Sequence, residues 1–132
     1  MAKDHLWTGV GLDNFLYYYG DYILPGAEIE RWLSHPHNFA LDLLVRTGLP
    51  GLLLFLGALL AAGLPIARRW QVHAPASRAV LVGLLGGLAA MFAHGLIDNA
   101  LFVPELAHWV FFVLAYLVNL PACLTVGGEW VD

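Results

Sequence analysis

Long apolar stretches separated by short polar ones make up most of the chain after residue 48. Residues 49–67 and 79–97 each run for nineteen residues, and residues 106–126 for twenty-one, without an acidic side chain, a lysine or an arginine. At 1.5 Å per residue each stretch covers about 30 Å, the thickness of the hydrocarbon core of a bilayer. Helices of a soluble bundle need a polar face, and these stretches have none. The pattern predicts an all-α membrane protein with about three transmembrane helices, at about 49–69, 77–98 and 105–126.

The first 48 residues are polar, aromatic and rich in turn residues, and we expect them to form a loop with short helices outside the membrane. Pro36 suits the first position of a helix, where its missing N–H costs nothing. This predicts a short helix over residues 36–47, with His37 and Asn38 in its first turn. Gly48-Leu49-Pro50-Gly51 interrupts the helix, because Pro50 removes one backbone hydrogen bond. The chain then divides into a loop with a short helix (1–48), three spans (49–126) and an inner tail (127–132), all in one unit.

Composition and charge support a membrane protein and give its orientation. The chain is 60% hydrophobic and only 12% charged, with a mean hydropathy of +0.71, which is unlike a soluble domain. Its net charge of −4 gives no argument for nucleic-acid binding. Arg68, Arg69 and Arg78 lie in one loop without an acidic residue, so the positive-inside rule predicts that this loop is cytoplasmic. The segment around His37 and the turn after residues 79–97 then lie together on the outer side.

The boundary between the polar and apolar parts carries the candidate chemistry. A histidine at a helix N-terminus feels the positive end of the helix dipole, which disfavours its charged form and suits a general base. Asp42 and Arg46 are one helical turn apart and are expected to pair. His35, His37 and Asp42 are an alternative metal site, but no fourth ligand stands at a familiar spacing, so we expect no metal.

The second span ends on two further polar residues, His94 and Asp98, which are one turn apart. Ionisable groups near membrane depth are costly to keep, so they mark either a structural hydrogen-bonded pair or part of the site.

Three motifs resemble those of the bacterial O-antigen ligase family, polytopic membrane enzymes that transfer lipid-linked glycans. Two lie in the first half of the chain: Gly9-Val10-Gly11-Leu12-Asp13-Asn14-Phe15, and His37-Asn38 followed after nine residues by Gly48-x-x-Gly51. The third is Ala93-His94-Gly95-Leu96-Ile97-Asp98-Asn99 with Val103-Pro104-Glu105. Members of the family are several times longer, so the resemblance implies that these residues correspond to its C-terminal portion, with further helices expected on the N-terminal side.

The resemblance implies inverting, metal- and cofactor-independent transfer of a glycan from undecaprenyl pyrophosphate to an acceptor hydroxyl, such as a sugar of the lipid A core. This step belongs to cell-surface polysaccharide and lipopolysaccharide biosynthesis and takes place on the periplasmic face of the inner membrane. His37 would be the general base, with Asn38 or Asp42 orienting its ring. The candidate substrate-binding residues are Asp42, Arg46, Arg31, His94 and Asp98.

The family's pyrophosphate-binding arginines lie in earlier outer loops, so the 132 residues alone are expected to be inactive. An O-antigen polymerase or a protein O-glycosyltransferase of the same superfamily fits the motifs equally well. A non-catalytic three-span membrane module is the alternative from a different class.

Overall fold

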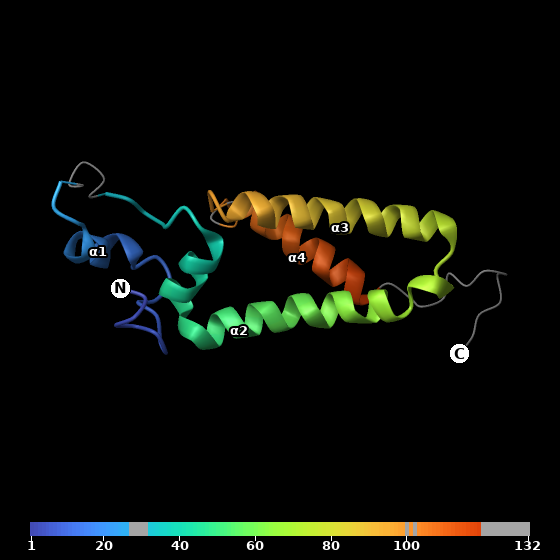
Figure 1. Ribbon diagram of the computed structural model, residues 1–132, viewed down its shortest axis with the longest axis horizontal. Helices are drawn as coiled ribbons and strands as arrows, with labels where there is room; N and C mark the ends of the chain where they lie inside the picture. Colours follow the sequence, from blue (N-terminus) through green and yellow to red (C-terminus); the bar gives the residue numbers. More distant parts are fainter. Residues whose placement is uncertain (27–31, 100, 102, 120–132) are drawn as a thin grey trace.

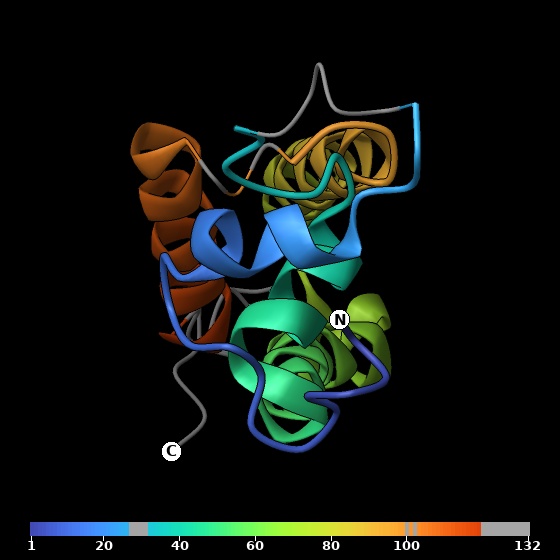
Figure 2. The ribbon, with the colours of Figure 1, turned by 90° about the vertical axis from the view of Figure 1, so that its left-hand side faces the viewer.

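The computed structural model describes residues 1–26, 32–99, 101 and 103–119, and within these ranges the secondary structure is entirely helical. The N-terminal part holds α1 (Phe15–Tyr19) and the 3₁₀ helix η1 (Gly20–Tyr22). The bundle holds α2 (Phe39–Arg68), the 3₁₀ helix η3 (Trp70–Val72), α3 (Pro75–Gly95) and α4 (Pro104–Asn119). In Figure 1, α2 and α3 run along the length of the molecule in opposite directions and α4 runs diagonally to them; Figure 2 shows that α4 lies to one side of both. The predicted all-α class is confirmed.

Two of these helices, α2 with 30 residues and α3 with 21, are long and apolar enough to cross a membrane, while α4 is a shorter apolar helix. Neither long helix is a buried core helix, because large apolar side chains such as Leu54 (76% exposed) face outward along them. Neither lies at the start of the chain, where a signal sequence would stand. The third predicted span was expected to reach residue 126, and residues 120–126 lie outside the described ones. The outward apolar surface is that of a membrane protein.

The bundle core lies between α2, α3 and α4. Ala62 and Ile66 of α2, with two leucines of α3, pack around the inner face of α4; the four core residues of α4 are Val110, Val113, Leu114 and Leu117. A second contact joins α2 to α3, where Phe39, Phe55 and Phe92 form a cluster with ring centroids 5.3–6.5 Å apart. These contacts fix how the start of α2 sits against the end of α3.

The helix α2 begins at Phe39, so the prediction of a helix starting at Pro36 is wrong. Asn38 has an extended backbone and its side chain accepts a hydrogen bond from the N–H of Leu41, which makes it the N-cap. Asparagine is among the best N-cap residues because its side-chain oxygen satisfies an otherwise free N–H. His37 therefore precedes the helix. The expected effect of the helix dipole on His37 assumed a place in the first turn, which the residue does not have.

The predicted interruption before the first span is confirmed, and it lies at Gly48. This residue has φ 71° and ψ −176°, so the segment 39–47 is set at an angle to the rest of α2 (Figure 1). The kink frees the carbonyl of Val45, and the missing N–H of Pro50 frees that of Arg46. Both carbonyls accept hydrogen bonds from the N-terminal segment, at 2.7 Å from the N–H of Val10 and 3.0 Å from that of Gly11. The N–H of Leu49 in turn donates to the carbonyl of Leu6 at 2.7 Å.

The N-terminal segment thus docks on the kinked part of α2 through backbone hydrogen bonds. Val10, Phe15 and Val45 form a small buried core beneath it. Figure 2 shows α1 lying across the end of the bundle, where α2 begins and α3 ends. We call this the site end, and we call the opposite end, with η3, Arg68, Arg69 and Arg78, the arginine end.

Candidate functional site

The amide of Asn38 joins the start of α2 to the turn that follows α3. Its side-chain oxygen caps α2 on the N–H of Leu41, and its side-chain nitrogen donates to the carbonyl of Leu96, each at 3.0 Å. A single side chain therefore brings two of the sequence motifs together. Because both of its polar atoms are bonded, the backbone beside His37 is held in place.

The imidazole of His37 lies 2.9 Å, Nδ1 to Oδ1, from the carboxylate of Asp98, which is 61 residues away in the chain. The two side chains are each a little more than half exposed, so the pair opens to the surface. The predicted approach of these two residues is confirmed. Asp98, and neither Asn38 nor Asp42, is the side chain that this hydrogen bond joins to the ring.

Asp98 itself is held by the turn in which it lies. Its N–H donates to the carbonyl of His94 at 3.0 Å, and its carboxylate accepts from the N–H of Asn99 at 2.8 Å. The hydrogen bond from His37, followed by that from Asn99, lowers the pKa of Asp98 below its usual 3.8. Near neutral pH Asp98 is therefore a carboxylate and can only accept, so Nδ1 of His37 carries the proton of this hydrogen bond.

A buried polar network lies beneath this exposed pair. Asp42 accepts from Nε of Arg46 at 2.7 Å and, with its other oxygen, from the amide of Asn99 at 2.8 Å. Arg46 also donates to the carboxylate of Asp13 at 2.9 Å and to the carbonyl of Ser34 at 3.2 Å. Asp42, Arg46 and Asn99 are all buried, so the predicted Asp42–Arg46 pair is confirmed and is one part of a larger network.

The structure brings five of the seven candidate residues into one region: His37, Asn38, Asp42, Arg46 and Asp98. The side chain of His94 is exposed and forms no hydrogen bond or ion pair with the described residues, although its carbonyl holds the Asp98 turn. Arg31 lies outside the described residues. Arg46 is buried and donates to two carboxylates and a carbonyl, an arrangement suited to positioning rather than to binding a substrate at the surface.

Two contributors were missed from the sequence, although both stand in the quoted motifs. Asn99 follows Asp98 directly and bonds Asp42, and Asp13 in the first motif bonds Arg46. The available signal for Asn99 was that two adjacent polar residues, Asp98 and Asn99, stand at the end of an apolar stretch. It could not show that Asp98 and Asn99 contact different partners.

His35, His37 and Asp98 are the group whose donor atoms best suit a metal ion. Each offers one ligand atom, and these atoms lie within 4.8 Å of one another. The rings of His35 and His37 meet edge to face, with centroids 5.4 Å apart. Asp98 thus replaces Asp42 as the third donor of the alternative metal site, since both oxygens of Asp42 are used within the buried network.

One comparison with known proteins gives a match, and it lies in the N-terminal part of the chain. The family model described as O-antigen ligase matches residues 1–56, which confirms the resemblance over this stretch. The match covers His37, Asn38, Asp42 and Arg46, and it ends before Asp98. Neither the curated proteins nor the solved structures contain a match to the chain.

Proposed function

We propose that this chain, whose residues 1–56 match the O-antigen ligase family, carries the general base of a glycan transfer and that His37 is this base. The observation that carries the proposal is the hydrogen bond between His37 and Asp98. It pairs an accessible imidazole with an ionised carboxylate, the arrangement that orients a catalytic histidine and stabilises its charged form.

The tautomer determines which ring nitrogen is reactive. Nδ1 of His37 carries the proton donated to Asp98, so Nε2 of the neutral ring has a free electron pair. When Nε2 takes a proton, the carboxylate of Asp98 lies against the resulting imidazolium and stabilises it. The role assigned to Asn38 or Asp42 in orienting the ring passes to Asp98.

In the proposed reaction the hydroxyl oxygen of the acceptor forms a bond to the anomeric carbon of a glycan carried on undecaprenyl pyrophosphate. The hydroxyl proton passes to Nε2 of His37. The bond between the anomeric carbon and the phosphate oxygen breaks, and the pyrophosphate leaves with the electron pair. The attack comes from the face opposite the leaving group, so the configuration at the anomeric carbon is inverted.

The buried network has a positioning role in this proposal. Asn99 holds Asp42, and Asp42 holds Arg46, so the turn that bears Asp98 is attached to the helix that follows His37. A pyrophosphate leaving group requires cationic partners. Arg46 faces its own carboxylates, so we expect these cations to come from outside the described residues, in earlier outer loops of a longer protein or from Arg31.

The experiment compares His37→Gln, His37→Ala and His35→Ala in cells that depend on the native-length protein for glycan transfer. Glutamine can still donate to Asp98 but cannot accept a proton at pH 7, so His37→Gln separates folding from catalysis. General-base assistance is worth about 10²–10⁴-fold, so we expect both His37 variants to lose transfer by at least about 100-fold while they insert normally. His35→Ala should be milder, because the hydrogen bond that orients the base joins Asp98 to His37, and this variant leaves Nε2 of His37 in place.

Near-normal transfer by His37→Gln would end the general-base proposal and favour a non-catalytic membrane module. Transfer that falls on addition of a chelator and returns with Zn²⁺ would instead favour the metal site of His35, His37 and Asp98. Under the proposal, chelator leaves transfer unchanged. The product analysed on a gel separates a ligase, which loads an acceptor once, from a polymerase, which lengthens the glycan.

A further inference from the structure

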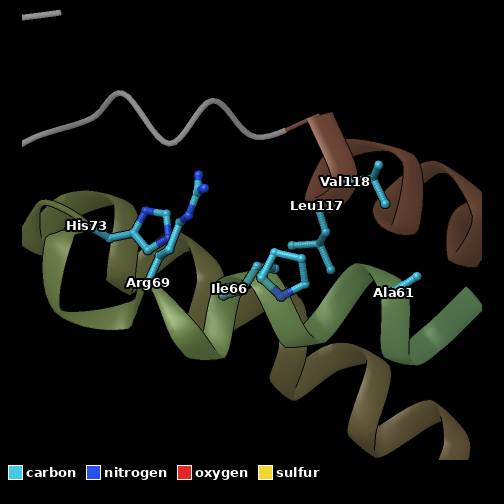
Figure 3. A pocket seen from close by; sticks show the side chains of 7 residues that line it. Ala61, Ile66, Arg69, His73, Leu117 and Val118 are labelled. Carbon is cyan, nitrogen blue, oxygen red and sulfur yellow. The ribbon is translucent and has the colours of Figure 1, made fainter. Parts of the chain in front are cut away.

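A small cavity lies at the arginine end, on the opposite side of the bundle from His37. It has a volume of about 140 Å³, the share of about four to five water molecules. Figure 3 shows its walls: the last turns of α2 with Arg69 and His73, and Leu117 and Val118 of α4. Ala61, Pro65 and Ile66 of α2 complete the lining. The cavity therefore has one polar wall and is otherwise apolar.

The polar wall contains a buried ring nitrogen without a hydrogen-bond partner. His73 is only 3% exposed, and its Nδ1 is buried without a hydrogen-bond partner. Its backbone is held, because the carbonyl of His73 accepts from Nε of Arg78 at 2.7 Å. A buried ring nitrogen without a partner is unfavourable, so the cavity suits a ligand that forms a hydrogen bond there. With the proton on Nδ1, that ligand is a hydrogen-bond acceptor.

The charge at this end favours an anion. Arg69 lines the cavity, its guanidinium pairs with no carboxylate among the described residues, and Arg68 precedes it. The third arginine, Arg78, donates to the carbonyls of His73 and Gln71 and keeps its positive charge. The sequence holds no acidic residue between Asp42 and Asp98, so no nearby carboxylate in that stretch offsets these charges.

We propose that this cavity binds the phosphate of an anionic lipid headgroup from the membrane leaflet at the arginine end. Arg69 would contact the phosphate oxygens and Nδ1–H of His73 would donate to one of them, while Ile66 and Leu117 contact the apolar start of the lipid. Arginine suits phosphate oxygens because its N–H groups can form paired hydrogen bonds. A lipid is favoured over free phosphate because the cavity combines a polar wall with an apolar one and lies at the end of a membrane-spanning helix. The proposal does not depend on the chemistry at His37.

The chain offers a matched pair of variants for the test. Arg69→Gln and Arg68→Gln remove the same charge from neighbouring positions, but Arg68 faces a different surface hollow, beside Trp70 and Gln71. The full chain, purified in detergent, is titrated with phosphatidylglycerol, and bound lipid is counted by native mass spectrometry. Loss of a hydrogen bond to a charged group should weaken binding about tenfold or more in Arg69→Gln. Arg68→Gln should change it less than about threefold, as expected for a screened surface charge.

His73→Phe keeps a ring of similar shape and removes the donor, so it should weaken lipid binding while the unfolding temperature is maintained or raised. Equal losses in Arg68→Gln and Arg69→Gln would overturn the proposal, because they would indicate a diffuse positive surface. Full binding by both Arg69→Gln and His73→Phe would also overturn it. Displacement of the lipid by an equal concentration of inorganic phosphate would overturn the assignment to a lipid headgroup.

Discussion

Replacement of Gly48 by alanine should detach the N-terminal segment from the bundle. At φ 71° and ψ −176° the backbone lies in a region that is essentially restricted to glycine, and a side chain there costs about 1–3 kcal/mol. The added Cβ would also lie 2.5 Å from the carbonyl oxygen of Trp7 and 2.9 Å from the backbone nitrogen of Thr8. Both neighbours are backbone atoms, so the segment must shift to make room.

The shift acts on the hydrogen bonds that join the N-terminal segment to the kinked part of α2. The bonds from Leu49 to Leu6 and from Val10 to Val45 are both 2.7 Å long. Each contributes about 0.5–1.5 kcal/mol, so losing both adds about 1–3 kcal/mol to the backbone strain. The total of about 2–6 kcal/mol corresponds to a loss of protection against local opening of about 30-fold or more.

Hydrogen exchange at the amides of Val10 and Gly11 measures this opening directly, because both donate to carbonyls of the kinked part of α2. The control is Gly57→Ala in the same helix, where the added Cβ meets no atom within 4 Å. Alanine there should be neutral or stabilise the helix by up to about 1 kcal/mol. Equal protection of Val10 and Gly11 in the two variants would refute the account of the kink.

Two further variants test the network and the exposed pair. Arg46→Met leaves the buried carboxylate of Asp42 without its ion partner and should lower the free energy of unfolding by about 3–5 kcal/mol. Asp13→Asn changes an exposed partner of Arg46 and should alter this free energy by less than about 1 kcal/mol. Denaturant titration in detergent measures both, and equal losses would contradict the prediction. Asp98→Asn should lose stability relative to wild type at pH 6, and the difference should vanish as pH falls below 3.8. Stability is lost at low pH because a carboxyl whose pKa is lowered by folding stabilises the folded state only while it is ionised. A constant difference in unfolding temperature between the two proteins from pH 6 to pH 3 would exclude this role for Asp98.

The membrane-spanning helices were predictable because absence of charge over about 20 residues is a local property of the sequence. The kink was predictable for a similar reason, since Pro50 cannot donate a helical hydrogen bond. The kink lies at Gly48, within the predicted interruption at residues 48–51. Its contact was not predictable, because the positive φ of Gly48 allows the close approach of Trp7 from a distant segment. The start of α2 also depends on distant residues: the amide of Asn38 binds Leu96 as well as its own helix, an advantage that Pro36 lacks.

The candidate site shows the same division between local and distant information. Asp42 and Arg46 pair across one turn, and their spacing alone predicted this. Asn38 or Asp42 was predicted to orient the ring of His37, but the hydrogen bond is to a carboxylate 61 residues away. The packing of α3 against Phe39 and the hydrogen bonds of Asn38 and Asn99 bring that carboxylate near. The spacing of residues along one helix does not contain this information.

The exposure of His37 explains why the site needs a buried network at all. A base that meets a large glycan acceptor must stay accessible, so it cannot be oriented by being packed in a core. Its orientation has to come from neighbours that are themselves held: Asn38 through two hydrogen bonds, and Asp98 through the adjacent Asn99, which is anchored to buried Asp42. Adjacent residues of one turn thus have different tasks, since Asn99 fixes the turn from inside and Asp98 presents its carboxylate at the surface. In the proposed mechanism, an exposed imidazole between two anchored residues keeps both its access to the acceptor and its orientation.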